Sequence, residues 1–491
     1  MNKFKTILSL LVLLVSQQVY AVDYNASVFG IKSNGTTLNT TAIQKAINFI
    51  HENGGGKLIF YVGRYLTGTI ELKSNVQIVL NEGAILVGSA NIYDYNIDTP
   101  YSSFIYAKNA ENIAITGKGV IDGQGREVAY NLIDQIHKGI IRDELKYDRP
   151  ASRRPRGIYF RECKNVEIDG IVIKNTADWV QVYDQCENLK INNITVDSKA
   201  FWNNDGLDIV DCKDVLVTNS FIDATDDAIC FKSHDATKMC ENVEVRNCVA
   251  RSSANGIKFG TVTSGGYKNF KIINNKVYDT YRSAITIATP DGGVIDNIWV
   301  DSLYAYNTGN AIYLRIGARW NKGRTGTMSN ITIQNMYAEI PATKPDAGYS
   351  YEGPVEDLPR NISPASIVGL PGQDITNVTL RNIEIVYPGG SNPNYAYRGI
   401  KSADLDSIPE MESAYPEFSQ FKELPAWGFY VRHAKNLRFE NITLTAKEKE
   451  YRAAIVLDDV KDAAFSGMKY NVPGGGKKIH SYKSTGIVQK K

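Results

Sequence analysis

Apolar residues alternate with polar ones in short segments that recur along most of the chain. Each segment starts with Asn or Asp and continues apolar, any residue, apolar, as in Asn165-Val-Glu-Ile, Asn242-Val-Glu-Val and Asn330-Ile-Thr-Ile. The alternation predicts a β-strand with one buried face. The leading Asn fits a tight turn, because Asn tolerates a left-handed backbone. The segments return at intervals of roughly 23 to 33 residues, a period typical of a stacked solenoid.

A second strand follows the first within a few residues in several repeats, as in Gly170-Ile-Val-Ile and Asn193-Ile-Thr-Val. Short strands joined by turns at this period predict an all-β fold, a parallel β-helix. Cysteine recurs at one position of the repeat, at Cys163, Cys186, Cys212 and Cys240. We interpret these cysteines as small buried residues stacked from coil to coil, with disulfides as an alternative in an oxidising compartment.

The N-terminal end departs from the repeat. Residues 41–54 predict an amphipathic helix that is capped by Thr40 or Thr41 and ended by the Gly54-Gly55-Gly56 run. Its apolar face would comprise Ile43, Ala46, Ile47 and Ile50. A helix at this place can cover the open end of the solenoid and hide its sheet edge.

Residues 1–21 have the parts of a secretion signal. Lys3 and Lys5 give a positive start, an apolar core runs from Ile7 to Val15, and Val19-Tyr20-Ala21 fits a cleavage site. The apolar core is too short to span a bilayer, which argues against a membrane anchor. We expect cleavage after Ala21 and a secreted or periplasmic protein without a membrane partner.

The spacing of the repeats grows where sequence rich in Pro, Gly and Tyr is inserted, at about 341–371 and 388–425. These insertions predict long loops on one face, and such loops often wall a binding cleft. We expect residues 22–491 to form a single, monomeric β-helix catalytic domain, with the cap and first coils in 22–100. The net charge of +2 argues against a nucleic-acid partner, which needs a clear basic excess.

Acidic residues gather in the turns of two neighbouring repeats. Asn203-Asn204-Asp205-Gly206 is followed about one repeat later by Asp226-Asp227. Residues one repeat apart lie side by side in a solenoid, with strands about 4.8 Å apart. Asp205, Asp226 and Asp227 should therefore form one cluster, in which crowding raises the pKa of one carboxyl. Such a cluster supplies the acid and the base that hydrolysis of a glycosidic bond requires. Asp208 fits an ordinary turn residue.

Basic and aromatic residues fall at similar positions of the neighbouring coils. Lys258, Arg282 and Arg315 could pair with the carboxylates of a uronic-acid substrate. Four aromatic residues could stack on sugar rings or simply pack in loops: Trp179, Trp202, Tyr313 and Trp320. A basic run is read as a solvated loop or as a wall of the substrate site: Arg149, Arg153, Arg154 and Arg156.

Several of these motifs resemble glycoside hydrolase family 28, the polygalacturonase and rhamnogalacturonase family, over nearly the whole mature chain. The segment Val28-Phe-Gly-Ile-Lys-Ser-Asn-Gly is similar to the family's N-terminal cap, and Leu66-Thr-Gly-Thr-Ile-Glu-Leu-Lys-Ser-Asn-Val to its first coil. Asn203-Asn204-Asp205-Gly206 resembles the Asn-Thr-Asp motif, and Asp226-Asp227 resembles the Asp-Asp pair.

The resemblance implies a right-handed parallel β-helix and an inverting hydrolysis that needs neither metal nor cofactor. Asp226 would be the general acid, and Asp205 and Asp227 would position and deprotonate the water. Arg315-Ile316 matches the first part of the family's Arg-Ile-Lys motif, which implies that Arg315 contacts the sugar.

Two departures imply an atypical member of the family. Ala254-Asn255-Gly256 stands in place of Gly-His-Gly, and Arg315-Ile316-Gly317 in place of Arg-Ile-Lys. The missing His and Lys serve galacturonate in polygalacturonases, and Lys232 or Lys258 could replace the lost charge. Rhamnogalacturonases also lack that His.

The resemblance thus implies an acidic, galacturonic-acid-containing pectic polysaccharide or oligosaccharide as substrate, of the rhamnogalacturonan or polygalacturonan type. The expected substrate-binding residues are Asn203, Lys232, Asn255, Lys258, Arg282, Arg315 and Trp179.

Two other functions fit the same fold. A pectate-lyase-like enzyme would hold Ca²⁺ with Asp and use Arg or Lys as the base for β-elimination. A glycan-binding β-helix would carry no catalysis. The order and spacing of the acids favour the hydrolase.

Overall fold

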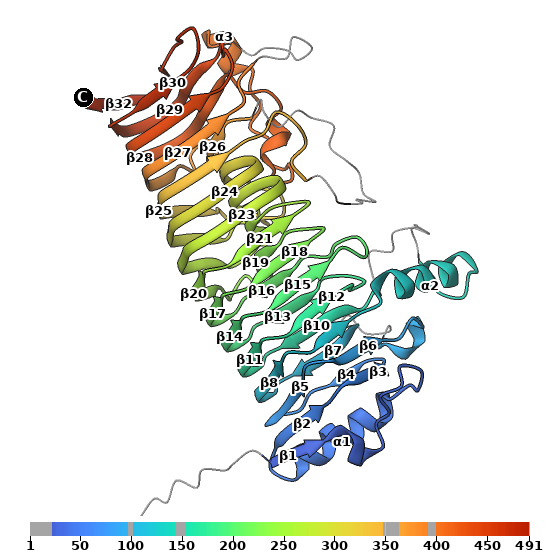
Figure 1. The fold of residues 1–491 in the computed structure, drawn as a ribbon. Coiled ribbons are helices and arrows are strands. Elements are labelled where there is room, and N and C mark those ends of the chain that lie inside the picture. The colour runs from blue at the N-terminus through green and yellow to red at the C-terminus, as the bar shows by residue number, and fades with distance from the viewer. Residues whose placement is uncertain are drawn as a thin grey trace, which may run out of the picture.

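The computed structural model describes residues 22–96, 102–143, 153–346, 349, 363–390 and 399–490. The expected signal segment, Arg149 and parts of both expected insertions lie outside the described residues. The described chain forms a right-handed parallel β-helix, in which coils stack from the N-terminal to the C-terminal end (Figure 1). No helix in this part of the chain is both long and apolar enough to cross a membrane.

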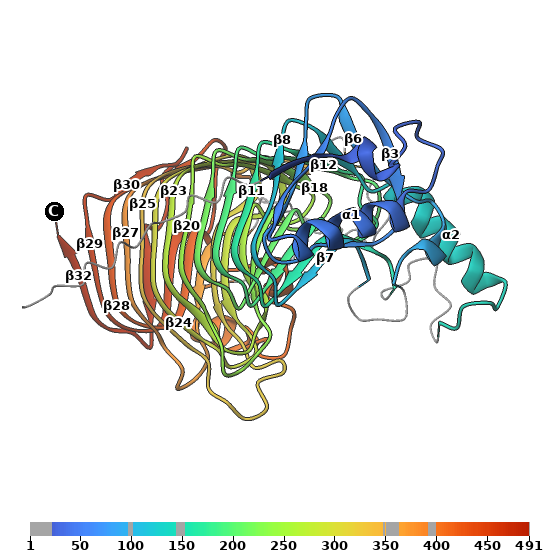
Figure 2. The same ribbon diagram turned by 90° about the horizontal axis from the view of Figure 1, so that it is seen from below.

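Each coil contributes strands to three parallel sheets, and Figure 2 shows the coils one behind another. We call the first the site sheet. Its short strands are β4 (Ile70–Glu71), β7 (Ser103–Lys108), β10 (Arg156–Arg161), β13 (Gln181–Asp184), β16 (Leu207–Val210), β19 (Ile229–Ser233), β22 (Ile257–Thr263), β26 (Ala365–Val368) and β31 (Ile479–Tyr482).

The chain then enters the second sheet and the third sheet. The second sheet contains β1 (Val22–Asn25), β2 (Gly56–Phe60), β5 (Val76–Leu80), β8 (Glu111–Gly117), β11 (Lys164–Asp169), β14 (Glu187–Asn192), β17 (Lys213–Thr218), β20 (Cys240–Arg246) and β32 (Thr485–Lys490). The third sheet contains β3 (Gly63–Thr67), β6 (Ala84–Gly88), β9 (Val120–Asp122), β12 (Val172–Lys174), β15 (Thr195–Ser198), β18 (Phe221–Ala224), β21 (Val249–Ser252) and β30 (Lys469–Asn471).

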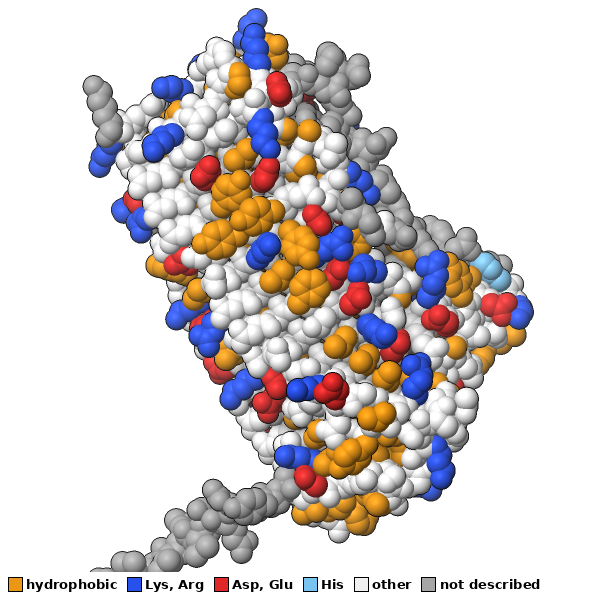
Figure 3. All heavy atoms as spheres, in the orientation of Figure 1, with side chains coloured by type: hydrophobic (Ala, Val, Ile, Leu, Met, Phe, Trp, Pro, Cys, Tyr) orange, Lys and Arg blue, Asp and Glu red, His pale blue; other side chains and the backbone are white. Residues whose placement is uncertain are grey.

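Toward the C-terminal end, longer strands continue round the corners and serve more than one sheet. They are β23 (Gly266–Thr289), β24 (Val294–Ile316), β25 (Thr327–Glu339), β27 (Ile375–Tyr387), β28 (Ala426–Ala446) and β29 (Ala453–Ser466). The outer surface mixes both charge signs, as the small net charge requires, and hydrophobic side chains gather over β23 to β25 (Figure 3).

The recurrent Asn residues form a ladder of side-chain amides along one corner of the solenoid. Asn165 and Asn269 have φ values of 53° and 59°, in the left-handed region. Asn188 donates an amide hydrogen bond of 2.7 Å to Asn165 in the coil before it, and Asn269 donates one of 3.1 Å to Asn242. The predicted left-handed turn is confirmed, and the ladder explains why Asn is used rather than Gly.

Replacing Asn269 by Ala is expected to lower the free energy of unfolding by about 2 kcal/mol. Ala is strained in a left-handed backbone, and the variant also loses the amide bonds to Asn242 and Asn297. Asn269→Gly is the matched control, because Gly accepts the backbone conformation and loses only the amides. Urea unfolding of the three proteins measures the difference. A Gly variant as unstable as the Ala variant would contradict the role given to the backbone.

Helix α1 (Thr40–Glu52) lies beside β1 and β2 at the N-terminal end of the solenoid (Figure 1). The apolar face predicted from the sequence is buried, which confirms the capping helix. The prediction that Thr40 or Thr41 caps the helix is wrong, because Asn39 is the N-cap residue. The Thr40 hydroxyl instead accepts the Gly68 N–H at 2.8 Å and so ties the helix to the first coil.

Other elements departed from the predictions or were not anticipated. Helix α2 (Gly125–His137) follows β9, and helix α3 (Ser402–Asp406) and the 3₁₀ segment η4 (Phe418–Phe421) lie in the second insertion. Two further 3₁₀ segments are η1 (Ala26–Phe29) and η2 (Ile92–Asp94). Strand β26 lies inside the stretch expected to be the first inserted loop, because its residues complete a coil of the site sheet between β24 and β28.

Phenylalanine side chains and most of the cysteines fill the interior beside the acidic turns. All six cysteines are buried free thiols. Burial in the core confirms the stacked-residue interpretation for the four that recur in the repeat: Cys163, Cys186, Cys212 and Cys240. Phe231 of β19 and Phe259 of β22 pack with ring centroids 4.8 Å apart, and Phe270 lies 4.9 Å from each. Because side chains alternate along a strand, inward Phe231 places Cys230 and Lys232 on the opposite face of β19.

Candidate active site

The acidic turns lie at the corner where the third sheet leads into the site sheet. Asp205 comes shortly before β16, and Asp226 and Asp227 lie between β18 and β19. The two strands pair in parallel, with Leu207 opposite Ile229. The turns of successive coils therefore lie side by side, as the spacing of the acids predicted.

Lys232 is the buried centre of the first group of charges. Its ammonium lies 3.1 Å from Asp205 Oδ2 and 3.0 Å from Asp208 Oδ1, and it donates to Cys230 Sγ at 3.0 Å. Burial is the main reason that the pKa of Asp205 lies well above its usual range, and Lys232 opposes the shift. Burial also raises the pKa of Asp208 to about 6, again against the pull of Lys232. Asp208 is thus part of the buried cluster and not a plain turn residue.

Asp227 is held as an ionised carboxylate. Lys258 Nζ lies 2.9 Å from Asp227 Oδ2. Asn255 donates to Asp227 Oδ1 twice, through its side-chain amide at 2.7 Å and its backbone N–H at 3.1 Å. Burial by itself would raise the pKa of Asp227. The ammonium groups of Lys258 and Lys232, the guanidinium of Arg282 and the amide of Asn255 outweigh burial, and the pKa falls to about 2. A carboxylate kept ionised in this way can accept a proton from water.

Asp226 is more accessible than the other two acids of the turn cluster. It is partly exposed, whereas Asp205 and Asp227 are buried. Its Oδ1 accepts the Asp227 N–H at 2.9 Å, and its Oδ2 accepts the Asn203 amide at 3.5 Å. Asn203 is itself held by buried Arg154, which donates to Asn203 Oδ1 at 2.9 Å. Asp226 can therefore present its carboxyl to a bound ligand from a defined position.

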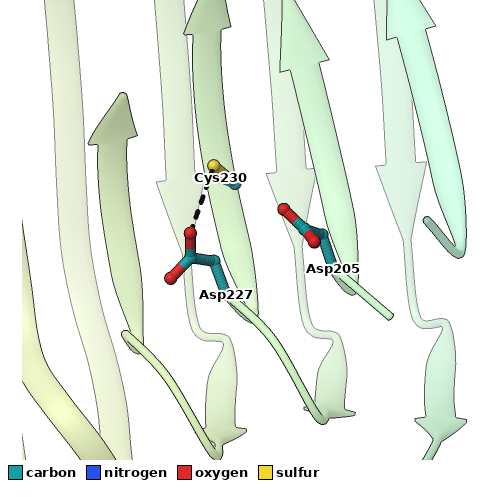
Figure 4. Close-up of side chains that lie close together, drawn as sticks. All are labelled: Asp205, Asp227 and Cys230. Atoms are coloured by element: carbon teal, nitrogen blue, oxygen red, sulfur yellow. Dashed lines mark hydrogen bonds between the residues drawn. The ribbon is translucent and has the colours of Figure 1, made fainter. Parts of the chain in front are cut away.

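Asp205, Asp227 and Cys230 bring possible metal-ligating atoms within 4.8 Å of one another, and the Cys230 thiol lies 3.9 Å from Asp227 Oδ2 (Figure 4). This group does not suit a resident metal ion. The Lys232 ammonium already contacts Asp205 and Cys230. Burial also holds the pKa of the Cys230 thiol well above its usual range, so the thiolate that a metal requires is disfavoured.

Two residues of the second insertion complete the site and were missed from the sequence. Glu417 is fully buried, with Oε1 3.1 Å from Arg282 Nη1 and 3.8 Å from Lys258 Nζ. The Tyr415 hydroxyl accepts from Lys258 at 3.0 Å and from Thr261 at 2.7 Å. The insertion was expected to wall a cleft, but nothing in its sequence singles out these two side chains from its other Tyr and Glu residues.

The expected substrate-binding residues fall into different places. Lys258 and Arg282 lie beside Asp227, where the sequence put them, but both contact Glu417. Asn255 is fully buried and supports Asp227, and its Oδ1 accepts from Ser283 N–H and Thr286 Oγ1. Asn255 and Lys232 therefore contact the buried acids and are not placed on a surface that a substrate could reach.

Arg315 is not brought to the carboxylates. Its buried guanidinium donates to the carbonyl oxygens of Gly369, Glu410 and Met411, at 3.1, 2.5 and 3.0 Å. These contacts join β24 to Gly369 at the end of the first insertion and to Glu410 and Met411 of the second. A contact between Arg315 and sugar stays a prediction from the resemblance, and the geometry gives Arg315 a role in holding the insertion.

Trp179 lies on the N-terminal side of the acids, just before β13. Lys232 Nζ is 4.7 Å and Arg156 Cζ is 5.2 Å from its ring. Of the other aromatic candidates, Tyr313 is buried and Trp202 packs against the core. Trp320 is 61% exposed and carries the Arg319 guanidinium 3.7 Å from its ring centroid. Trp179 is thus the aromatic candidate nearest to the charged cluster.

Comparison with known proteins shows which family this site is similar to. Residues 60–294, which include both acidic turns, match Glycosyl hydrolases family 28. An exo-poly-alpha-D-galacturonosidase of Dickeya chrysanthemi is 26% identical over 454 residues, which cover 78% of this chain and 74% of that protein.

Two solved structures share the fold. The exopolygalacturonase of Thermotoga maritima is 24% identical, with a TM-score of 0.60, over 75% of this chain and 88% of that chain. The family 28 exopolygalacturonase of Yersinia enterocolitica is 20% identical, with a TM-score of 0.61, over 95% of this chain and 78% of that chain. They confirm the expected β-helix.

Proposed function

The chain belongs to glycosyl hydrolases family 28 and is a glycoside hydrolase, and we propose that it cleaves a galacturonic-acid-containing pectic glycan with inversion. One observation carries the proposed mechanism: a partly exposed carboxyl, Asp226, lies next to Asp227, a buried carboxylate that Lys258 and Asn255 keep ionised. Unequal environments of this kind divide two carboxyl groups into an acid and a base.

In the proposed reaction Asp226 protonates the glycosidic oxygen as its bond to the anomeric carbon breaks. A water molecule attacks that carbon from the opposite face and gives its proton to Asp227. Asp205 lies with Asp227 and helps to position the water. The products are a sugar with an inverted anomeric centre and the protonated leaving alcohol, and no covalent enzyme intermediate forms.

The substrate is proposed to be a polygalacturonan or a rhamnogalacturonan. The Dickeya relative is an exo-poly-alpha-D-galacturonosidase, which supports a galacturonosyl bond. The absence of the family's Gly-His-Gly sequence at Ala254-Asn255-Gly256 favours a backbone other than plain polygalacturonan. The signal-like pattern of residues 1–21 supports export, where such polymers are met.

The proposal is tested by incubating the mature protein with homogalacturonan and rhamnogalacturonan oligosaccharides and weighing the products. We expect products heavier by one water, with the inverted anomer seen first by proton NMR, and none with Asp226→Asn. Unsaturated products that require Ca²⁺ would instead establish a lyase. Binding of both glycans without turnover would indicate a binding protein and overturn the hydrolytic proposal.

A further inference from the structure

Glu417 fills a position beside the catalytic acids that a substrate carboxylate could otherwise take. Its side chain is 1% exposed and its Oε1 lies 3.1 Å from Arg282 Nη1. The same oxygen accepts the Asn255 amide at 3.3 Å and lies 3.8 Å from Lys258 Nζ. A carboxylate that takes three cationic or amide contacts in a buried site is firmly bound there.

The charges on this side of Asp227 are balanced before any ligand arrives. Lys258 is fully buried between Asp227 and Glu417, and Arg282, whose side chain is 19% exposed, pairs with Glu417. On this side of the site, two carboxylates, Asp227 and Glu417, therefore meet two cations, Lys258 and Arg282. A third carboxylate, brought by a uronic acid, would find these cations already paired and would be repelled by Asp227 and Glu417.

Tyr415 provides an aromatic ring and a hydroxyl group that a sugar could contact on this side of the site. Tyr415 is 40% exposed, and its ring lies 4.9 Å from Lys258 Nζ and 5.7 Å from Arg282 Cζ and therefore covers the paired cations. An exposed aromatic ring stacks on the apolar face of a sugar without requiring charge. Its hydroxyl accepts two hydrogen bonds from the protein and keeps its own hydrogen to donate.

The N-terminal side of the acids presents different residues from the side that Glu417 occupies. Trp179 lies there with Arg156 Cζ 5.2 Å from its ring, and Arg156 also lies over Tyr159 at 4.9 Å. This side therefore combines an aromatic ring with a guanidinium, a cation that suits the carboxylate of an acidic sugar.

We propose that Glu417 is a specificity-determining residue, which makes the subsite on the C-terminal side of Asp227 select a neutral sugar and reject a uronic acid. The inference rests on the proposed function, because it assigns one of the sugars that flank the cleaved bond. A substrate that alternates neutral and acidic sugars fits both sides of the acids, whereas a polymer of uronic acids fits one.

The test uses Glu417→Gln, which keeps the shape and removes the charge, with Glu412→Gln as matched control. Glu412 is an exposed residue of the same insertion. We compare kcat/KM for a homogalacturonan oligosaccharide with that for an alternating rhamnogalacturonan oligosaccharide. Glu417→Gln is expected to shift this ratio toward the homogalacturonan by about tenfold or more, and Glu412→Gln is expected to leave it unchanged. An unchanged ratio in Glu417→Gln would overturn the inference.

A second measurement does not depend on turnover. Calorimetric titration with D-galacturonate is expected to show binding at least tenfold tighter in Glu417→Gln than in the wild type, with binding of L-rhamnose retained. Adding Arg282→Met should abolish the gain, because it removes the cation that Glu417 had paired, and thermal unfolding checks that each variant is folded. Galacturonate binding that Glu417→Gln leaves unaltered would count against Glu417. If no glycan is cleaved but this gain is seen, the proposed function fails and the role of Glu417 stands.

Discussion

Replacing Asp226 by Asn is expected to lower kcat by about 10²- to 10⁴-fold, the range that a positioned acid or base contributes. The amide has the shape of the carboxyl, and its oxygen can still accept the Asp227 N–H that Oδ1 accepts at 2.9 Å. What is lost is the proton for the leaving oxygen. KM and thermal stability should therefore change little. Asp197→Asn is the control, because Asp197 is an exposed acid on β15.

An aryl glycoside of the cleaved sugar separates the roles of the two adjacent acids. Its leaving group departs without protonation, so Asp226→Asn should lose much less activity on this substrate than on the natural bond. Asp227→Asn should remain impaired on both, because activation of water is still required. Equal losses on both substrates in Asp226→Asn would refute its assignment as the general acid.

The elements predicted well from the sequence are those whose signal is local and repeated. The recurrent Asn followed by alternating apolar residues predicts both the strand and its turn. Only a few residue types accept the left-handed backbone seen at Asn165 and Asn269. The buried face of α1 follows from helical spacing alone. Helix α2 carries a similar signal, since Val128, Leu132 and Ile136 are spaced by four residues and buried. It was missed because it interrupts the repeat.

The clustering of the acids could be predicted because coil period and strand spacing together bring Asp205 beside Asp227. Lys232 was expected at the substrate. Its burial depends on which face of β19 it occupies and on Asp208 of the neighbouring strand, neither of which the coil period defines. Glu417 approaches Arg282 only through the folded path of an insertion. Contacts of this kind depend on tertiary structure and leave no periodic trace.

Arg315 is a residue that the sequence places in the site and the structure places elsewhere. The sequence places it on the strip with the acids, and its match to the start of the Arg-Ile-Lys motif supports that interpretation. In the structure it lies near the end of β24, opposite Val368 of β26, and its partners are carbonyl oxygens. The backbone carbonyls of an insertion are acceptors whatever their residue type. No sequence motif could therefore predict that they bind Arg315.

Replacing Lys232 by Met is expected to move the acidic limb of the pH profile of kcat/KM upward by about 1 to 3 units. Lys232 lowers the pKa of Asp205 and of Asp208, against burial, which raises both. Without the ammonium these carboxyls keep their protons to a higher pH. The ionised carboxylate of Asp205, which helps to position the water, then forms only at that higher pH. Below the limb the loss of activity should reach about 10- to 10³-fold, since each unit of pKa is a factor of ten.

The pH profile decides between this role and the substrate contact that the sequence suggested for Lys232. A lysine that binds a substrate carboxylate would raise KM at every pH and leave the limb where it was. Lys232→Arg keeps the charge and should keep the limb, which also shows that the buried position tolerates substitution. Lys199→Met is the matched control, because Lys199 likewise pairs with two acids, Asp197 at 2.7 Å and Asp223 at 2.6 Å, outside the site. A limb that stays in place in a folded Lys232→Met protein would mean that the buried ammonium does not set the ionisation of the acids.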